Sequence, residues 1–294
     1  MSEQHINPQQ VGRAFGRSAE TYDAHAVLQR EVADRLDAHL EFSKIKPQRM
    51  LDIGCGTGYF GRLLHKRFPK AHLTAMDIAH GMLLSARAGH PRRMPWKGGA
   101  AYARGDAARL PFADASFDLV GSSLAMQWVR DPEKMLAEMR RVLAPGGLMV
   151  LSTFGRRTLG ELRQSLASLS PDYAGLVLPF PDVTSLGDAL MKLPVELPVT
   201  DTDLFNVTYP DPMALVRELK GLGASSSAIR NRPLGLYGRK LLRHLEVDYA
   251  ARHRDEDGRI RATFEVLYAQ AWFADAPRQY EDVIPIRMQD AEGV

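Results

Sequence analysis

The sequence predicts an α/β protein built on a doubly wound, mostly parallel sheet, and three observations lead to this fold class. Between residues 24 and 154, short apolar runs alternate with segments whose apolar residues recur at helical spacing, as in successive βαβ units. The first of these runs ends in the turn LDIGCGTG, which carries three glycines. The 294 residues are 45% hydrophobic and 25% charged, which is ordinary for a globular protein.

The first half of the chain supplies most of the expected sheet. In chain order it reads as helix 24–42, strand 49–54, helix 59–68, strand 71–77, helix 81–88, strands 100–106 and 117–124, helix 131–147 and strand 148–154. Asp131 and Pro132 are typical of a helix N-cap and a first helical position. The sequence Pro-Gly-Gly at 145–147 indicates the end of the same helix.

The second half is less regular but contains further helices and strands. It reads as helices 158–169, 184–193, 211–223 and 237–253, with strands at 203–209 and 259–273. The segment 170–182, with three prolines, reads as a loop. This order predicts a helical insertion between two late strands that folds over the sheet.

Composition excludes several classes of protein. No run approaches 18 apolar residues, so we expect no transmembrane helix, and the N-terminus lacks the apolar region of a secretory signal. The single cysteine, Cys55, excludes an intrachain disulfide and fits a reducing compartment. We therefore expect a cytoplasmic protein. The nine histidines show no metal-binding spacing, so we expect no metal.

The glycine turn does not fit the two common phosphate-binding patterns. A dinucleotide fingerprint requires G-x-G-x-x-G, whereas here the third glycine, Gly58, comes one residue early and Tyr59 follows it. A P-loop requires Gly-Lys-Ser/Thr at its end, and no lysine follows. The spacing D-x-G-x-G-x-G after a strand instead resembles the first motif of the class I S-adenosylmethionine-dependent methyltransferases.

Four further segments resemble that family in order and spacing. Asp77 ends the next strand, 19 residues after Gly58, where the family's acid accepts the ribose hydroxyls. Asp106 ends the third strand, where an acid hydrogen-bonds the adenine amino group. Residues 116–129 resemble the fourth motif, beside the reactive methyl, and residues 140–153 resemble the helix, turn and strand that follow it.

The resemblance implies S-adenosylmethionine as cofactor and a Rossmann-like, seven-stranded sheet. The implied cofactor-binding residues are Asp52, Gly54, Cys55, Gly56, Gly58, Asp77, Met82, Asp106, Ala107, Ser123 and Leu124. Taken singly, the glycines could serve only a tight turn, the acids could be caps, and Cys55 is a small buried residue rather than a nucleophile. The expected organisation is an N-terminal helical lid (1–48), a cofactor-binding core (49–155), an insertion for acceptor recognition with the final strands (156–273) and a loose tail (274–294).

The flanking segments are more selective than the glycine motif. Residues 14–30, 152–163, 215–227 and 262–272 resemble the malonyl-acyl-carrier-protein O-methyltransferases of biotin synthesis. The resemblance implies methylation of the free carboxylate of a malonyl thioester, carried on acyl carrier protein or on coenzyme A, to give the methyl ester that primes pimeloyl synthesis. Two segments depart from the family, because 90–100 looks like extra length and 274–294 matches nothing.

Two other functions stay open from the sequence. Complex I assembly factors resemble the same chain and act on a protein arginine. A small-molecule methyltransferase of the quinone or aconitate type would share the cofactor motifs. We expect no nucleic acid and no membrane as partners.

The acceptor chemistry places few demands on catalytic residues. A carboxyl group titrates near pH 4, so the nucleophile is already ionised at pH 7 and no strong base is required. Arg163 is the candidate for orienting the carboxylate, because its planar fork matches two oxygens, and the alternative is a solvated helix arginine. Tyr22 and His25 are lid candidates. Gln127 and Trp128 are candidates for the pocket wall, with Trp128 as a core residue the alternative.

One stretch of the chain is strongly basic. Between Gly221 and Leu245 there is no Asp or Glu. The same stretch carries Arg230, Arg232, Arg239, Lys240 and Arg243. An acyl carrier protein is acidic, so these residues are candidates for docking it, and a solvated helix face is the alternative.

Overall fold

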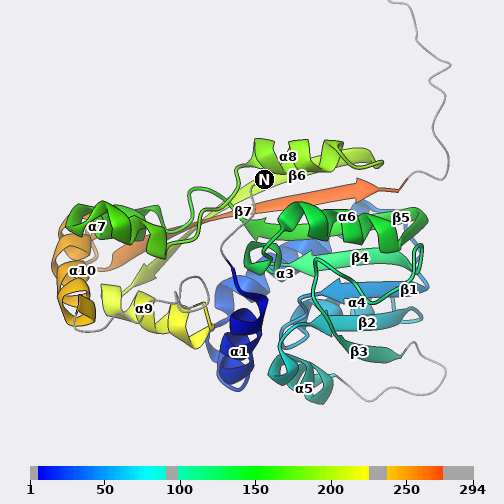
Figure 1. Ribbon diagram of the computed structural model, residues 1–294, viewed down its shortest axis with the longest axis horizontal. Helices are drawn as coiled ribbons and strands as arrows, with labels where there is room; N and C mark the ends of the chain where they lie inside the picture. Colours follow the sequence, from blue (N-terminus) through cyan, green and yellow to red (C-terminus); the bar gives the residue numbers. More distant parts are fainter. Residues whose placement is uncertain (1–5, 91–98, 225–236, 274–294) are drawn as a thin grey trace, which may run out of the picture.

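The computed structural model describes residues 6–90, 99–224 and 237–273 (Figure 1). The helices are α1 (Pro8–Ser18), α2 (Tyr22–His25), α3 (Val27–His39), α4 (Tyr59–Arg67), α5 (His80–Gly89), α6 (Pro132–Val142), α7 (Gly160–Leu169), α8 (Val183–Met191), α9 (Pro212–Gly221) and α10 (Tyr237–His253), with the 3-10 helices η1 (Leu40–Phe42), η2 (Met126–Trp128) and η3 (Pro171–Leu176). The strands are β1 (Arg49–Ile53), β2 (His72–Asp77), β3 (Ala100–Arg104), β4 (Phe117–Ser123), β5 (Leu143–Phe154), β6 (Glu196–Tyr209) and β7 (Ile260–Trp272).

These strands form a seven-stranded sheet in the order β3-β2-β1-β4-β5-β7-β6. The first five are parallel, whereas β7 is antiparallel to both β5 and β6. The strand order reverses beside β1, and ligands of doubly wound sheets bind at such a point, outside the carboxyl ends of the strands. The predicted fold class is therefore confirmed.

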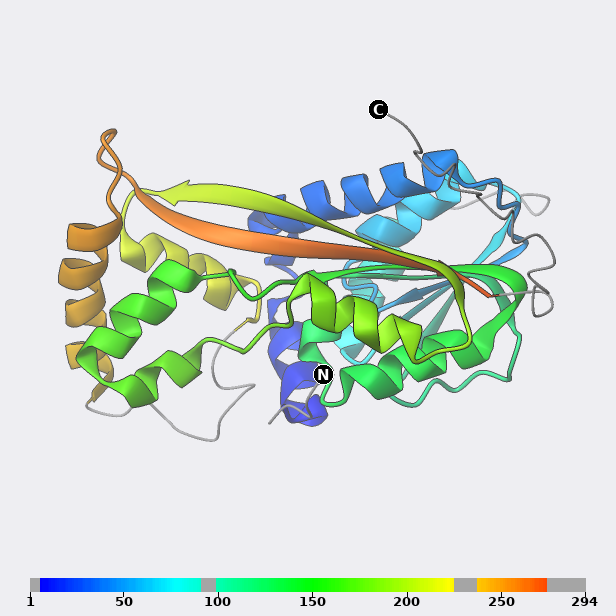
Figure 2. The same ribbon diagram turned by 90° about the horizontal axis from the view of Figure 1, so that it is seen from above.

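Alternating residues of the central strands pack against helices on opposite faces of the sheet. Met149 and Leu151 of β5 belong to a core with α6 and α8, whereas Leu148 and Val150 belong to a core with α3 and α4. Figure 2 shows these two layers of helices on either side of the strands. Burial on both faces explains why the parallel strands read as continuous apolar runs in the sequence.

The last two strands extend well beyond the central sheet. They pair in register from Glu196 opposite Trp272 to Tyr209 opposite Ile260. Figures 1 and 2 show that their far end carries α7, α9 and α10 as a separate group of helices. This group has its own core, which includes Leu162, Leu215 and Tyr249. The insertion is therefore in two parts, because β6 separates the segment holding α7 and α8 from the segment holding α9 and α10.

Several element boundaries differ from the sequence prediction. Strand β5 begins at Leu143 rather than 148, β3 ends at Arg104 rather than 106, and the expected loop 170–182 contains η3. Three further differences have a local structural cause. Strand β6, expected at 203–209, begins at Glu196, because pairing with β7 continues past Pro198 through an irregular register between Glu196 and Val199. Helix α6 ends at Val142 rather than 147, since Leu143 already pairs with Phe117 of β4. The helix expected over 24–42 is interrupted at Ala26, whose φ and ψ of −87° and 40° are not helical.

Helix α1 lies within residues 1–48, the segment for which the sequence predicts a helical lid without giving the bounds of this helix. Asn7 caps it, with its side-chain oxygen accepting from the backbone N–H of Gln9 and Gln10. It lies against α5 through two glycines: a Cβ added to Gly81 would meet the carbonyl oxygen of Gly16 at 2.6 Å. This close approach places α1 over the carboxyl ends of β1 and β2.

No helix in the described part of the chain is long and apolar enough to cross a bilayer.

Candidate active site

All three glycines of the turn after β1, Gly54, Gly56 and Gly58, adopt positive φ. Gly54 (φ 69°) passes so close to Ala125 that a Cβ would overlap the Ala125 side chain. Gly56 (φ 53°) instead faces open space, because a Cβ there would meet no atom within 4 Å. The backbone at Gly56 is therefore accessible to a ligand.

The carboxylate of Asp77 is held at the end of β2 by two backbone groups. Its Oδ2 accepts from the N–H of Gly56 at 2.9 Å, and its Oδ1 accepts from the N–H of Ala79 at 2.7 Å. Burial raises the pKa of Asp77, and these backbone N–H groups oppose the shift. Each oxygen keeps a lone pair that a ligand hydroxyl can use.

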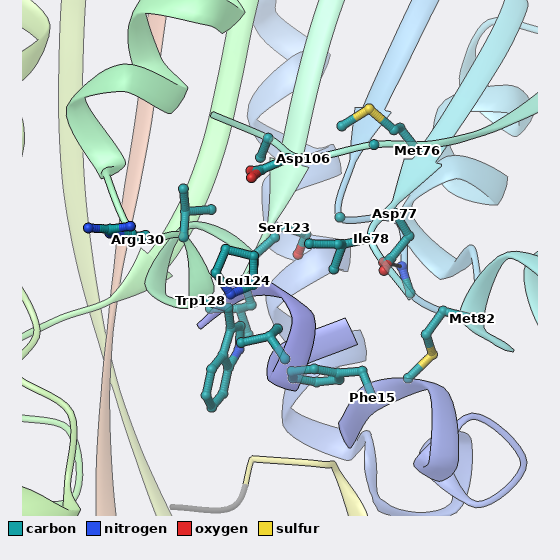
Figure 3. Close-up of a pocket in the computed structure, with 18 of the residues that line it drawn as sticks. Phe15, Met76, Asp77, Ile78, Met82, Asp106, Ser123, Leu124, Trp128 and Arg130 are labelled. Carbon is teal, nitrogen blue, oxygen red and sulfur yellow. Dashed lines mark hydrogen bonds between the residues drawn. The ribbon is translucent and has the colours of Figure 1, made fainter. Parts of the chain in front are cut away.

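A cavity lies directly over this turn and the ends of β2, β3 and β4. It encloses about 740 Å³ of space, open solvent included. Figure 3 shows Asp77 and Asp106 on its walls, with Phe15 of α1 and Trp128 of η2 at one end. The Phe15 and Trp128 rings meet edge to face, with centroids 5.2 Å apart.

A second cavity, of about 870 Å³ on the same measure, adjoins the first. The two cavities share four lining residues: Phe15, Tyr22, Leu124 and Trp128. We call the first the cofactor cavity, the second the acceptor chamber, and the four shared residues the junction. The rest of the chamber is mainly apolar, with walls from α3, α7, η3 and α9.

The backbone at the junction is held in an unusual conformation. Leu124 has a φ of 48°, which a branched side chain rarely adopts. Its carbonyl oxygen accepts from Gln127 Nε2 at 2.7 Å, and Gln127 Oε1 accepts from the Thr153 hydroxyl at 3.2 Å. Gln127, predicted as a wall residue, does line the chamber.

Tyr22 is a neutral phenol at the junction. Burial, followed by the nearby carboxylates of Asp77 and Asp23, raises the pKa of Tyr22 above its usual range. Its hydroxyl is therefore a hydrogen-bond donor at neutral pH rather than a base.

The structure brings most of the predicted cofactor residues to one cavity. The lining includes Gly54, Gly56, Asp77, Met82, Asp106, Ala107, Ser123 and Leu124. Asp52, Cys55 and Gly58 are not among the lining residues. Asp52 is buried beneath the turn, where burial and the charge of Asp77 raise its pKa to about 7. The Cys55 thiol is also buried, which raises its pKa.

The predicted acceptor residues are more dispersed. Arg163 of α7 lines neither cavity: its Nη2 donates to the carbonyl oxygen of Leu178 at 2.9 Å, and its Nε is buried without a hydrogen-bond partner. Burial lowers the pKa of Arg163. His25 packs against Gly221 of α9, where an added Cβ would meet its ring at 2.5 Å.

The predicted docking residues fall at the edge of what the structure describes. Lys240 and Arg243 are exposed on α10. Arg230, Arg232 and the side chain of Arg239 lie outside the described residues. Within the described ranges, no group of three or more His, Cys, Asp or Glu side chains is arranged to hold a metal ion.

Sequence reasoning did not identify several residues of the two cavities. Phe15, Ile78 and Gln29 were not singled out, although each lines one or both cavities. Ile78 could have been found, since it directly follows the acid that ends β2. Phe15 and Gln29 reach the site only because α1 and α3 fold back over the sheet.

Comparison with known proteins agrees with this geometry. Residues 51–151 match a methyltransferase domain family. Two solved structures share the fold: the YcgJ protein from Bacillus subtilis (TM-score 0.57, 15% identity, 83% of this chain and 99% of that one) and a putative methyltransferase from Bacillus halodurans (TM-score 0.56, 19% identity, 82% and 98%). The chain therefore contains a methyltransferase domain and has the fold of these two structures.

Sequence relatives narrow the class. A protein of Halorhodospira halophila is 41% identical over 99% of this chain and 96% of its own length, and one of Laribacter hongkongensis is 41% identical over 89% and 88%. Both are named malonyl-[acyl-carrier protein] O-methyltransferase, as is a relative from Methylovorus that is 40% identical over 91% of this chain and 89% of its own. The chain belongs to the malonyl-[acyl-carrier protein] O-methyltransferase family.

Proposed function

We propose that this enzyme methylates the free carboxylate of a malonyl group carried on acyl carrier protein, giving the methyl ester that primes pimeloyl synthesis for biotin. The relatives' names supply the substrate, and one structural observation supports it for this chain. The mainly apolar acceptor chamber meets the cofactor cavity at the junction. An acyl group on a long arm fits such a chamber, and only its end would reach the cofactor.

The cofactor cavity fits S-adenosylmethionine by the chemistry of its polar side chains. Asp77 would accept the ribose hydroxyls, and Asp106, whose Oδ1 already accepts from Ala108 N–H at 2.9 Å, would receive the adenine amino group. The open space beside Gly56 would be filled by the methionine part. Bound there, the cofactor supplies an electrophilic methyl group on a positively charged sulfur.

The apolar chamber favours this particular methyl transfer. With the cofactor bound there, methyl transfer would combine the negative charge of the carboxylate with the positive charge of the sulfonium. A negative and a positive charge are thereby consumed, so surroundings that solvate separate ions poorly favour the transition state. Phe15, Leu124 and Trp128 supply such surroundings, and the Tyr22 hydroxyl is a neutral donor that can orient the carboxylate without neutralising it.

Arg163, which the sequence predicts to orient the carboxylate, instead contacts the backbone of the chamber wall. Its hydrogen bond to the Leu178 carbonyl braces a residue of the chamber wall, because Leu178 lines the chamber and Arg163 does not. We propose that Arg163 is a positioning residue that holds this wall in place, rather than a direct partner of the carboxylate.

A mass measurement tests the proposed function. Malonyl-carrier protein incubated with enzyme and S-adenosylmethionine should gain the mass of one methylene group, whereas acetyl-carrier protein, which lacks a free carboxylate, should not. Absence of the gain, or its appearance on acetyl-carrier protein, would contradict the proposal. A gain of one oxygen on a protein arginine would instead support the assembly-factor alternative.

A further inference from the structure

Gln29 has a buried polar atom that no residue of the described chain satisfies. It lies in the first turn of α3 and lines the acceptor chamber. Its Oε1 is buried and has no hydrogen-bond partner. Buried polar groups are nearly always paired, so an amide left unpaired beside a cavity is a candidate contact for a ligand.

The other polar side chains that line the chamber are already engaged. Both ends of the Gln127 amide are used, as described above. The Thr158 hydroxyl donates to the carbonyl of Glu265 at 2.9 Å and accepts from its N–H at 3.0 Å. Glu218 accepts from the Tyr209 hydroxyl at 2.8 Å. Apart from Tyr22 and the indole N–H of Trp128, which both lie at the junction, Gln29 is thus the donor side chain of the described chamber lining that has no hydrogen-bond partner in the described residues.

Gln29 and Tyr22 differ in which cavity they line, and this difference indicates which part of the acceptor each residue would contact. Tyr22 lines both cavities, so a group beside it is next to the reacting methyl, whereas Gln29 lines only the chamber. A group next to Gln29 therefore lies inside the chamber, farther along the acceptor than the carboxylate at the junction. In a malonyl thioester the next polar group after the carboxylate is the thioester carbonyl, one methylene away.

We propose that Gln29 donates an amide N–H to the thioester carbonyl and so selects acyl groups in which one methylene separates carboxylate from carbonyl. Oε1 is the buried end of the side-chain amide, and the Nε2 end carries the N–H groups that a carbonyl oxygen can accept. The inference rests on the proposed acceptor. Tyr22 and Gln29 then hold the two ends of the malonyl group, and a longer diacid cannot satisfy both while its carboxylate faces the methyl.

The test compares Gln29→Met, which keeps the length of the side chain and removes the amide, with Gln164→Met, the same change at an exposed position of α7. For each enzyme, kcat/KM is measured on malonyl- and succinyl-carrier protein, with KM for S-adenosylmethionine alongside. Gln29→Met should lose about tenfold or more on the malonyl substrate, because sites that hydrogen-bond a substrate discriminate strongly. Its succinyl rate and cofactor KM should change little, so the malonyl preference falls. Gln164→Met should match the wild type.

Each outcome has a defined meaning. An unchanged malonyl-to-succinyl ratio in Gln29→Met overturns the role of Gln29 and leaves the proposed function intact. Wild-type enzyme that transfers no methyl to malonyl-carrier protein overturns both. If Gln29→Met does not fold, Gln29→Glu serves in its place: its carboxylate would repel the malonyl group, and retention of full malonyl activity would overturn the proposal.

Discussion

The carboxylate of Asp77 accepts a hydrogen bond from the backbone N–H of Gly56 at 2.9 Å, which ties the end of β2 to the glycine turn that follows β1. The acid predicted to bind the ribose therefore also holds the turn on which the cofactor would rest. Ala79 N–H donates to the other oxygen, so the carboxylate cannot rotate freely. The predicted ribose contact and the shape of the glycine turn therefore involve the same side chain.

Replacing Asp77 by Ala should weaken cofactor binding more than the loss of ribose contacts alone would do. Hydrogen bonds to a charged group contribute about 1.5–3 kcal/mol each, so affinity should fall by about tenfold or more. Titration calorimetry with S-adenosylhomocysteine measures it. Asp172→Ala, at an exposed position in η3, is the control. Unchanged affinity in Asp77→Ala would remove Asp77 from the cofactor site.

Asp52 should make the stability of the protein depend on pH. Its pKa is about 7 in the folded chain against 3.8 as the ordinary value, so the folded state binds more protons between these values. Stability then falls as pH rises through this window, by a few kcal/mol at most at about 1.4 kcal/mol per pKa unit. The Asp52→Asn side chain cannot ionise, so the stability of this variant should lack this part of the pH dependence. Its free energy of unfolding should therefore rise relative to that of the wild type between pH 5 and pH 8. Urea unfolding at pH 5 and pH 8 measures the free energy of unfolding of both proteins. The same change with pH in the variant and the wild type would contradict this role of Asp52.

The contact between Gly81 and Gly16 should control how closely α1 covers the cofactor. In Gly81→Ala the new methyl would meet the Gly16 carbonyl oxygen at 2.6 Å, which is backbone and cannot move alone. We expect α1 to be displaced and the KM for S-adenosylmethionine to rise severalfold. Gly187→Ala, in α8 with no atom within 4 Å, is the matched control and should stabilise the protein by about 1 kcal/mol. An unchanged KM in Gly81→Ala would show that α1 does not close the site.

Some of this site could be predicted from the sequence because its signals are local. Gly54, Gly56 and Asp77 lie within one βαβ unit, where spacing along the chain determines which atoms meet. Residues from distant elements could not be predicted in this way: Gln29 reaches the chamber only through the packing of α3. For the same reason β6 is longer than its sequence suggests, since pairing with β7 carries it past a proline that would otherwise indicate a loop.

Arg163 should affect the acyl substrate without affecting the cofactor. Removing its guanidinium in Arg163→Ala frees the Leu178 carbonyl and loosens one wall of the acceptor chamber. The KM for malonyl-carrier protein should rise severalfold while the KM for S-adenosylmethionine stays the same. Arg157→Ala, at an exposed position just before α7, is the control. Equal effects on both KM values would indicate a general loss of structure instead, and no effect would place Arg163 outside the acceptor site.

The exposed cations of α10 should contribute to docking the carrier protein. Lys240 and Arg243 lie on the outer surface of α10, so reversing both to Glu should leave the fold intact and repel an acidic partner. At low salt the KM for malonyl-carrier protein should rise severalfold, and the difference should shrink as salt screens the charges. Malonyl-pantetheine, which carries no protein, should be turned over as by the wild type. The control reverses Lys66 and Lys70, which are exposed at the end of α4 and just after it. If the α10 variant and this control behave alike toward the carrier protein, the docking surface is elsewhere.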